Sequence, residues 1–122
     1  MPVTIYGIKN CDTMKKARAW LEAHAVPYVF HDYKLRGIDH DTLQAWARLV
    51  GWETLLNRAG TTYRKLPDAS KAHLDQSKAI ALMLAQPSMI KRPVLEADGR
   101  LIVGFTPETY SRRFQRRSPP MN

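Results

Sequence analysis

The chain has a single cysteine among its 122 residues, so no disulfide can form within it. It also lacks an apolar run long enough to predict a membrane-spanning helix. The first residues, Met1–Thr4, lead into a strand-like run without the basic and then apolar regions of a secretory signal. These absences predict a protein of the reducing cytoplasm with no membrane association, in which one compact domain buries a core without cross-links.

Acidic residues are scarce, with 11 Asp and Glu against 19 Lys and Arg, and the net charge is +8. Part of the excess lies near the C-terminus, at Arg112, Arg113, Arg116 and Arg117. Residues 115–122 read as a disordered basic tail. Because no zinc-ligand spacing, aromatic RNA-binding motif or helix-turn-helix signature accompanies the charge, we expect no direct nucleic-acid binding. The basic surface either favours small anions or an acidic protein partner, or is ordinary solvated charge.

The sequence predicts a unit of strands and helices near each end of the chain. Near the N-terminus, a strand-like run at Val3–Gly7, an amphipathic helix from Thr13 to His24 and a second strand-like run at Tyr28–Asp32 predict a parallel β-α-β unit. Near the C-terminus, Val94–Ala97 and Leu101–Gly104 flank an Asp-Gly pair, which is a strong hairpin signal and predicts antiparallel strands. Thr106 as N-cap and Pro107 at the first helical position then begin a last helix.

The middle of the chain reads as a helical insert of about residues 36–90. Helices are predicted at Asp39–Val50 and Ser77–Leu84, joined by polar turns around 57–63 and 67–70. The whole pattern predicts an α/β fold, a thioredoxin-like mixed sheet of β-α-β plus β-β-α, in a single domain over residues 1–114.

Cys11 stands at the junction of the first strand and the first helix. The unpaired N–H groups and the positive end of the helix dipole lower the pKa of a thiol placed there, so Cys11 is a candidate nucleophile. Asp12 or Thr13 is expected to cap this helix, although a carboxylate at Asp12 opposes thiolate formation. The alternative is a buried cysteine that only packs.

Four segments carry a resemblance to a known family. They are Tyr6–Thr13, Asn57-Arg58, Ile90–Val94 and Gly104-Phe105. Together they resemble the family that unites glutaredoxin-coupled arsenate reductases (ArsC) with Spx-type regulators, and within it the YffB branch. The resemblance extends from Val3 to about Phe114 and implies a thioredoxin fold with a helical insert.

The resemblance also implies roles for individual residues. Pro93 matches the position of a cis-proline beside the active cysteine, although it would also serve as a strand-entry residue. Arg92 and Arg58 match arginines that hold an oxyanion and stabilise the thiolate, as bidentate guanidinium groups can. The remaining binding candidates contribute charge, hydrogen bonds or backbone contacts, and they are Lys9, Asn10, Thr13 and Lys91.

Two departures from the family pattern shape the expected function. Gly104-Phe105 lacks the third arginine of arsenate reductases, and Met14 stands where several Spx-type members have a second cysteine. Any oxidised Cys11 therefore needs an external thiol, for which glutathione is the natural co-substrate. The leading hypothesis is a glutathione-dependent thiol oxidoreductase with no bound cofactor.

Two other functions stay open. The first is a non-catalytic regulator that binds RNA polymerase, and the second is an arsenate reductase that uses glutathione and glutaredoxin. No metal site is expected, because none of the four histidines has ligand spacing with Cys11; they are His24, His31, His40 and His73. We expect these histidines at the surface or in partial packing.

Overall fold

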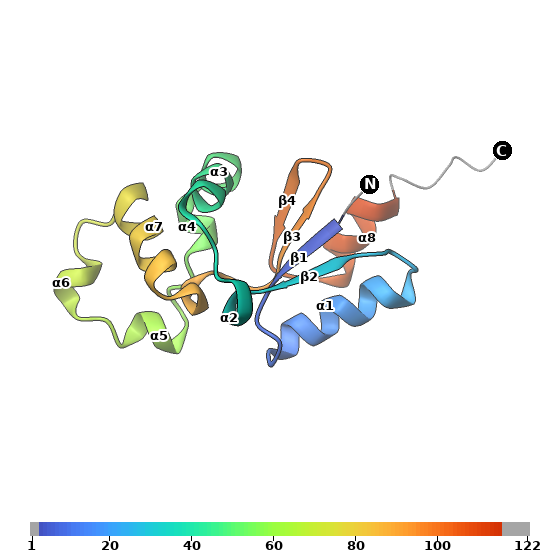
Figure 1. The fold of residues 1–122 in the computed structure, drawn as a ribbon, viewed down its shortest axis with the longest axis horizontal. Helices are drawn as coiled ribbons and strands as arrows, with labels where there is room; N and C mark the ends of the chain where they lie inside the picture. The colour runs from blue at the N-terminus through green and yellow to red at the C-terminus, as the bar shows by residue number, and fades with distance from the viewer. Residues whose placement is uncertain (1–2, 116–122) are drawn as a thin grey trace.

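The structure is a computed structural model that describes residues 3–115. Within them, one mixed sheet has the strand order β2-β1-β3-β4 (Figure 1). β1 pairs in parallel with β2 and antiparallel with β3, and β3 pairs antiparallel with β4. The strands are β1 Val3–Gly7, β2 Val29–Asp32, β3 Val94–Ala97 and β4 Arg100–Val103. The predicted thioredoxin-like arrangement, β-α-β followed by β-β-α, is confirmed.

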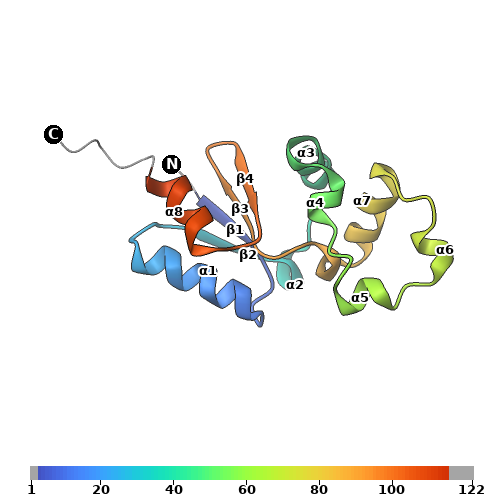
Figure 2. The ribbon, with the colours of Figure 1, turned by 180° about the vertical axis from the view of Figure 1, so that it is seen from behind.

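Helices occupy the rest of the described chain. In chain order they are α1 Asp12–Ala23, α2 Tyr33–Arg36, α3 His40–Val50, α4 Trp52–Leu55, α5 Thr61–Arg64, α6 Asp68–Lys71, α7 Gln76–Ala85, a 3-10 helix η1 Pro87–Met89 and α8 Pro107–Gln115. Helices α3 to α7 group at one end of the molecule, whereas α1 and α8 lie beside the sheet at the other end (Figures 1 and 2). The helices between β2 and β3 therefore form the predicted insert.

Two apolar clusters correspond to these two halves. Val3 and Ile5 of β1 are buried against Ala17 and Leu21 of α1 and Tyr110 of α8. The insert has its own cluster, which Tyr6 and Val103 contact from the sheet. Because successive residues of a strand point to opposite faces, β1 contributes to both clusters, and its buried and half-buried residues alternate.

The insert is connected to the sheet at the start of β3. An isolated antiparallel bridge joins Leu56 to Ile90, and the amide of Lys91 donates to the carbonyl of Leu55 at 2.8 Å. Beyond this bridge the chain passes through Arg92 and Pro93 into β3. The insert therefore fixes the backbone on which Arg92 is carried.

The hairpin and the last helix form as their signals predict. Asp98 and Gly99 both have positive φ, as a two-residue hairpin turn requires. The guanidinium of Arg113 donates to the carboxylate of Asp98 at 2.9 Å and to the carbonyl of Ala97 at 3.0 Å, which ties α8 to the hairpin. The hydroxyl of Thr106 accepts from the amide of Thr109 at 3.1 Å and caps α8.

Several details differ from the expectations. The segments predicted as polar turns contain the one-turn helices α5 and α6, and α2 and α4 were not predicted at all. A helix of four residues is too short to show a 3.6-residue apolar period, so the pattern misses it. The expected disordered tail lies outside the described residues except for Gln115, which ends α8.

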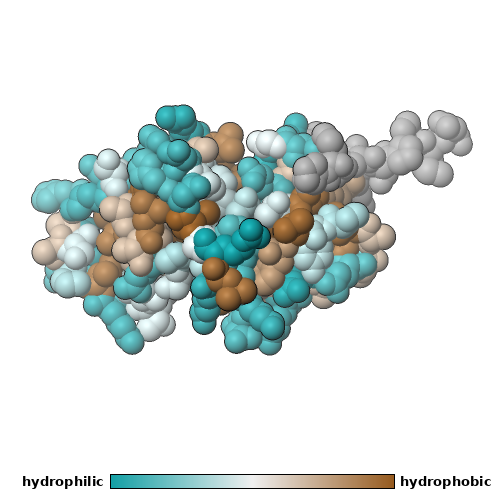
Figure 3. Space-filling model, in the orientation of Figure 1, coloured by the Kyte–Doolittle hydropathy of each residue, from teal (hydrophilic) through white to brown (hydrophobic). Residues whose placement is uncertain are grey.

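The face drawn in Figure 3 is a mosaic in which hydrophobic patches are separated by hydrophilic side chains. Leu35 on α2 is the most exposed of the large apolar side chains described, at 83%. In residues 3–115 no helix is both long and apolar enough to cross a membrane.

Close packing at Gly7 brings the first turn of α1 against the end of β1. Met14 is fully buried, and its side chain occupies the space that a side chain at Gly7 would need. A Cβ added at Gly7 would collide with the Met14 sulfur and lie 2.9 Å from its terminal methyl carbon. The absence of a side chain at Gly7 thus leaves room for the Met14 side chain, which packs the first turn of α1 against the end of β1.

We expect Gly7→Ala to lower the free energy of unfolding by roughly 1 to 3 kcal/mol, because overpacking a tight contact forces side chains out of their rotamers. Urea denaturation measures this change. In a Met14→Ala background the colliding side chain is absent, so the same substitution should cost less. An equal cost in both backgrounds would contradict this account of Gly7.

Candidate active site around Cys11

Cys11 is the N-cap residue of α1. Its backbone is extended, with φ −129° and ψ 127°, and its carbonyl accepts the amide of Lys15 at 3.0 Å. The side chain makes no capping hydrogen bond, so the expectation that Asp12 or Thr13 caps this helix is wrong. The thiol is partly exposed and contacts the cluster formed by α1, α8 and the sheet. The cysteine is therefore partly accessible to solvent and lies at the first turn of the helix.

The environment of Cys11 favours the thiolate. Burial is the largest single influence and raises the pKa of the thiol, but several interactions together outweigh it. The backbone N–H groups of Met14 and Thr13 and the positively charged guanidinium of Arg92 all stabilise the thiolate form. The pKa of Cys11 is therefore lowered from its ordinary value, as expected for a thiol beside a cation at a helix N-terminus.

Arg92 is held from the side of the insert. Its Nη1 donates to the carbonyl of Ser88, in η1, at 2.9 Å. Its Nε is buried and has no hydrogen-bond partner among the described residues. The guanidinium thus acts on the thiol while its Nε–H has no acceptor among the described residues.

The peptide bond between Arg92 and Pro93 is cis, so the cis assignment for Pro93 is confirmed. Pro93 is buried, and its carbonyl accepts the amide of Gly104 at 2.8 Å. This bond brings the end of β4 to the start of β3. The backbone that follows Arg92 is therefore held by both strands of the hairpin.

The other predicted site residues are more dispersed. Arg58 is exposed, and its guanidinium lies over the ring of Trp52 at 5.7 Å rather than contributing to the pKa shift of Cys11. Lys9, Asn10 and Lys91 are exposed. Thr13 acts on the sulfur through its backbone amide. Their roles in binding a substrate remain predictions.

Sequence reasoning missed two residues next to Arg92. Ser88 supplies the carbonyl that anchors the guanidinium, and Tyr33 lies close enough for the charge of Arg92 to act on its hydroxyl. A signal for Tyr33 was present, because Asp32 caps the short helix α2 by accepting the amide of Lys34 at 2.9 Å. Ser88 acts through its backbone, for which no sequence signal exists.

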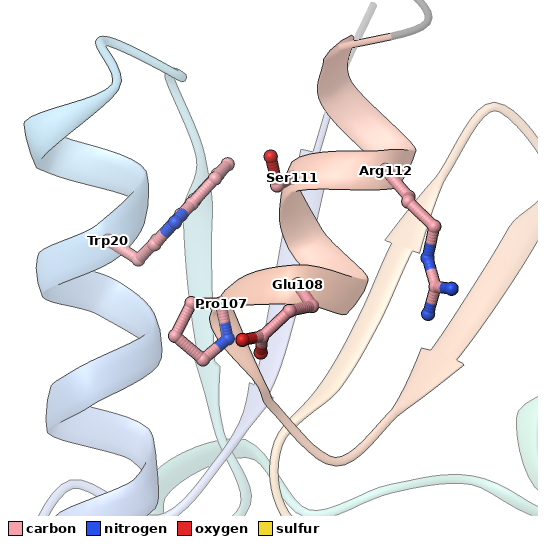
Figure 4. Close-up of a pocket in the computed structure, with 5 residues that line it drawn as sticks. All are labelled: Trp20, Pro107, Glu108, Ser111 and Arg112. Atoms are coloured by element: carbon pink, nitrogen blue, oxygen red, sulfur yellow. The ribbon is translucent and has the colours of Figure 1, made fainter.

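A cavity of about 520 Å³ lies between α1 and α8, away from the thiol. Figure 4 shows the ring of Trp20 projecting from α1 toward α8, with Pro107, Glu108 and Ser111 on the opposite side. Trp20 follows Cys11 by nine residues, which corresponds to roughly 14 Å along the helix axis. This cavity is therefore not part of the site around Cys11.

The histidines are placed as expected, with His24, His40 and His73 exposed and His31 half-buried. His31 contacts the carbonyl of Gly37 at 2.7 Å through Nε2. Within residues 3–115, no three His, Cys, Asp or Glu side chains gather into a group suited to a metal ion. The chemistry that the described residues can supply is that of an activated thiol beside one arginine.

Comparison with known proteins agrees with this architecture. The model of the ArsC family matches residues 6–113. A solved structure of a YffB protein is 64% identical, with a TM-score of 0.88 over 90% of this chain and 96% of that one. An arsenate reductase (ArsC) related protein from Brucella melitensis is 62% identical, with a TM-score of 0.76 over 94% of this chain and 96% of that one.

A more distant relative is a regulator. The global transcriptional regulator Spx of Bacillus subtilis is 27% identical over 114 residues, which are 92% of this chain and 86% of that protein. Reductase-related and regulatory proteins are thus both similar to this chain over most of its length. Since the family model covers most of the sheet, the insert and the cysteine loop, the chain belongs to the ArsC family.

Proposed function

We propose that the chain is a cytoplasmic, glutathione-dependent thiol oxidoreductase whose single nucleophile is Cys11. The observation that carries the proposal is the partly exposed thiol at the N-terminus of α1, whose pKa is lowered by backbone N–H groups and Arg92 against the opposing effect of burial. The chain has no other cysteine, so the electrons must be exchanged with an external thiol. Glutathione is the small thiol whose carboxylates suit a basic surface.

The reaction consists of two thiol-disulfide exchanges. The Cys11 thiolate attacks one sulfur of glutathione disulfide, the S–S bond breaks, and one glutathione thiolate leaves with the electron pair. A second thiol, from glutathione or from glutaredoxin, then attacks the mixed disulfide and releases Cys11 as a thiolate. Arg92 stabilises the negative sulfur in both steps.

An arsenate reductase is a weaker candidate. Arg92 is the arginine that acts on the Cys11 thiol, while Arg58 lies over Trp52, and Gly104-Phe105 supplies no third guanidinium. Removing a single donor from a charge-stabilising set typically costs about 10²- to 10³-fold in rate. Arsenate reduction by this site would therefore be slow.

The second candidate function is regulation of transcription through contact with RNA polymerase. The similarity to global transcriptional regulators named Spx supports it. In this alternative the fold serves as a docking surface, and loss of the thiol leaves binding intact. An acidic surface on the polymerase would suit the positive charge of this chain.

We expect the pKa of Cys11, measured from the pH dependence of iodoacetamide alkylation, to lie below the usual value of about 8.5. Alkylation should stay fast as the pH falls below that value and slow down only near the lowered pKa. Arg92→Ala should raise the pKa, because it removes the positive guanidinium that favours the thiolate.

Arg48→Ala is the matched control for this measurement. Arg48 is an exposed arginine on α3 that does not contribute to the pKa shift of Cys11, so its removal should leave the midpoint unchanged. An ordinary pKa in the wild type, or equal midpoints in all three proteins, would contradict the proposed activation of the thiol.

Glutathione disulfide should convert the wild-type protein to a mixed disulfide, detected by mass spectrometry, and Cys11→Ser should abolish the adduct because it removes the chain's only thiol. Capture of RNA polymerase by immobilised wild type and Cys11→Ser tests the alternative function. Equal capture by both proteins, without any glutathione adduct on the wild type, would favour the regulator.

A further inference from the structure

The carbonyl of Ser88 is free to hold Arg92 because of how its own segment is paired. In the 3-10 helix η1, amides donate to carbonyls three positions earlier, at 2.9 and 3.0 Å. The Lys91 amide is next in this series, but it donates to the carbonyl of Leu55 in the insert at 2.8 Å. The carbonyl of Ser88 is therefore available to the guanidinium of Arg92, whose Nη1 donates to it at 2.9 Å.

The side chain of Ser88 is bonded to another helix of the insert. The hydroxyls of Ser88 and Thr62 are hydrogen-bonded at 3.1 Å, and Thr62 belongs to α5. Figures 1 and 2 both show α5 beside the segment that leads from α7 to β3, which contains η1. Both side chains are half-buried, so the bond is partly shielded from water. Thr62 thus connects α5 to the residue that anchors Arg92.

The guanidinium of Arg92 depends on this anchor. Among the described residues its Nε has no hydrogen-bond partner, and no carboxylate forms an ion pair with it. A long arginine side chain has many rotamers, and holding it in one of them costs conformational entropy that its contacts must offset. Because the effect of a charge falls with distance, a shift of Ser88 that moves the guanidinium changes how strongly it favours the Cys11 thiolate.

We propose that Thr62 is a positioning residue for the active site, which holds Arg92 beside Cys11 through its hydrogen bond to Ser88. The inference rests on the proposed function, because the place of the guanidinium matters only where Cys11 reacts as a thiolate. It adds a role for α5, a one-turn helix of the insert. Without the Thr62 hydroxyl, η1 loses its bond to α5, the guanidinium is held less firmly, and the thiolate is less favoured.

The test measures the pKa of Cys11, from the pH dependence of iodoacetamide alkylation, in variants that remove this one bond. Thr62→Val removes the hydroxyl and keeps the branched shape, whereas Thr62→Ser keeps the hydroxyl. Ser88→Ala removes the same bond from the other side and retains the backbone carbonyl that Arg92 uses. Thr61→Val is the matched control, because Thr61 is the exposed neighbour in α5 and the hydroxyl that meets Ser88 is that of Thr62.

We expect Thr62→Val and Ser88→Ala each to raise the pKa of Cys11 by about 0.3 to 0.5, the lower end of the net contribution of one hydrogen bond. Since both remove the same bond, the double variant should raise the pKa no further. Thr62→Ser and Thr61→Val should keep the wild-type pKa. In an Arg92→Ala background Thr62→Val should leave the pKa unchanged, because the guanidinium through which Thr62 acts is absent.

A purely structural role for Thr62 gives different results. It would lower the urea midpoint of unfolding without changing the pKa of Cys11, or shift that pKa equally with and without Arg92, and either result would overturn the proposal. If Arg92→Ala raises the pKa while Thr62→Val and Ser88→Ala do not, the positioning role fails and the activated thiol of the proposed function stands. An ordinary pKa in wild type would refute both. Ser88→Ala tests the same bond should Thr62→Val not fold.

Discussion

The backbone N–H groups of the first turn of α1, which favour the Cys11 thiolate, are the feature around which this molecule is arranged. They require that the helix begin at the cysteine itself, and the N-cap geometry of Cys11 meets that requirement. They also require the turn to lie against the end of β1, which the contact between Gly7 and Met14 provides. Without this turn, Arg92 alone would oppose burial, which raises the pKa of the thiol.

The position of the Arg92 guanidinium, by contrast, depends on the insert. Arg92 follows the bridge between Leu56 and Ile90, and its side chain is anchored on the carbonyl of Ser88. Helices far from Cys11 in sequence thus determine where the guanidinium lies. A sheet with α1 and α8 alone would hold the sulfur but not its positive neighbour.

The sequence predicts the parts of this site that have local causes. The strand before Cys11, the Asp98-Gly99 hairpin and the cap at Thr106 each follow from a few neighbouring residues, and all three form as expected. Arg92 was reached only through the resemblance to a family. The carbonyl of Ser88 could not be predicted, because a backbone acceptor leaves no sequence signal. Asp32 signals the start of the short helix that carries Tyr33, but not that Tyr33 lies near Arg92. Arg58, assigned by the same resemblance, lies over Trp52, and its role in binding an oxyanion stays a prediction.

Met14 has a structural role at the position where several Spx-type proteins have a second cysteine. It lies one turn after Cys11 and is fully buried, so its side chain stabilises the helix against the sheet and cannot resolve an oxidised thiol. The insert reaches the same site from the other side, because Ser88 anchors the guanidinium of Arg92. The sheet half of the molecule thus holds the Cys11 thiol, and the insert positions the cation that favours its thiolate.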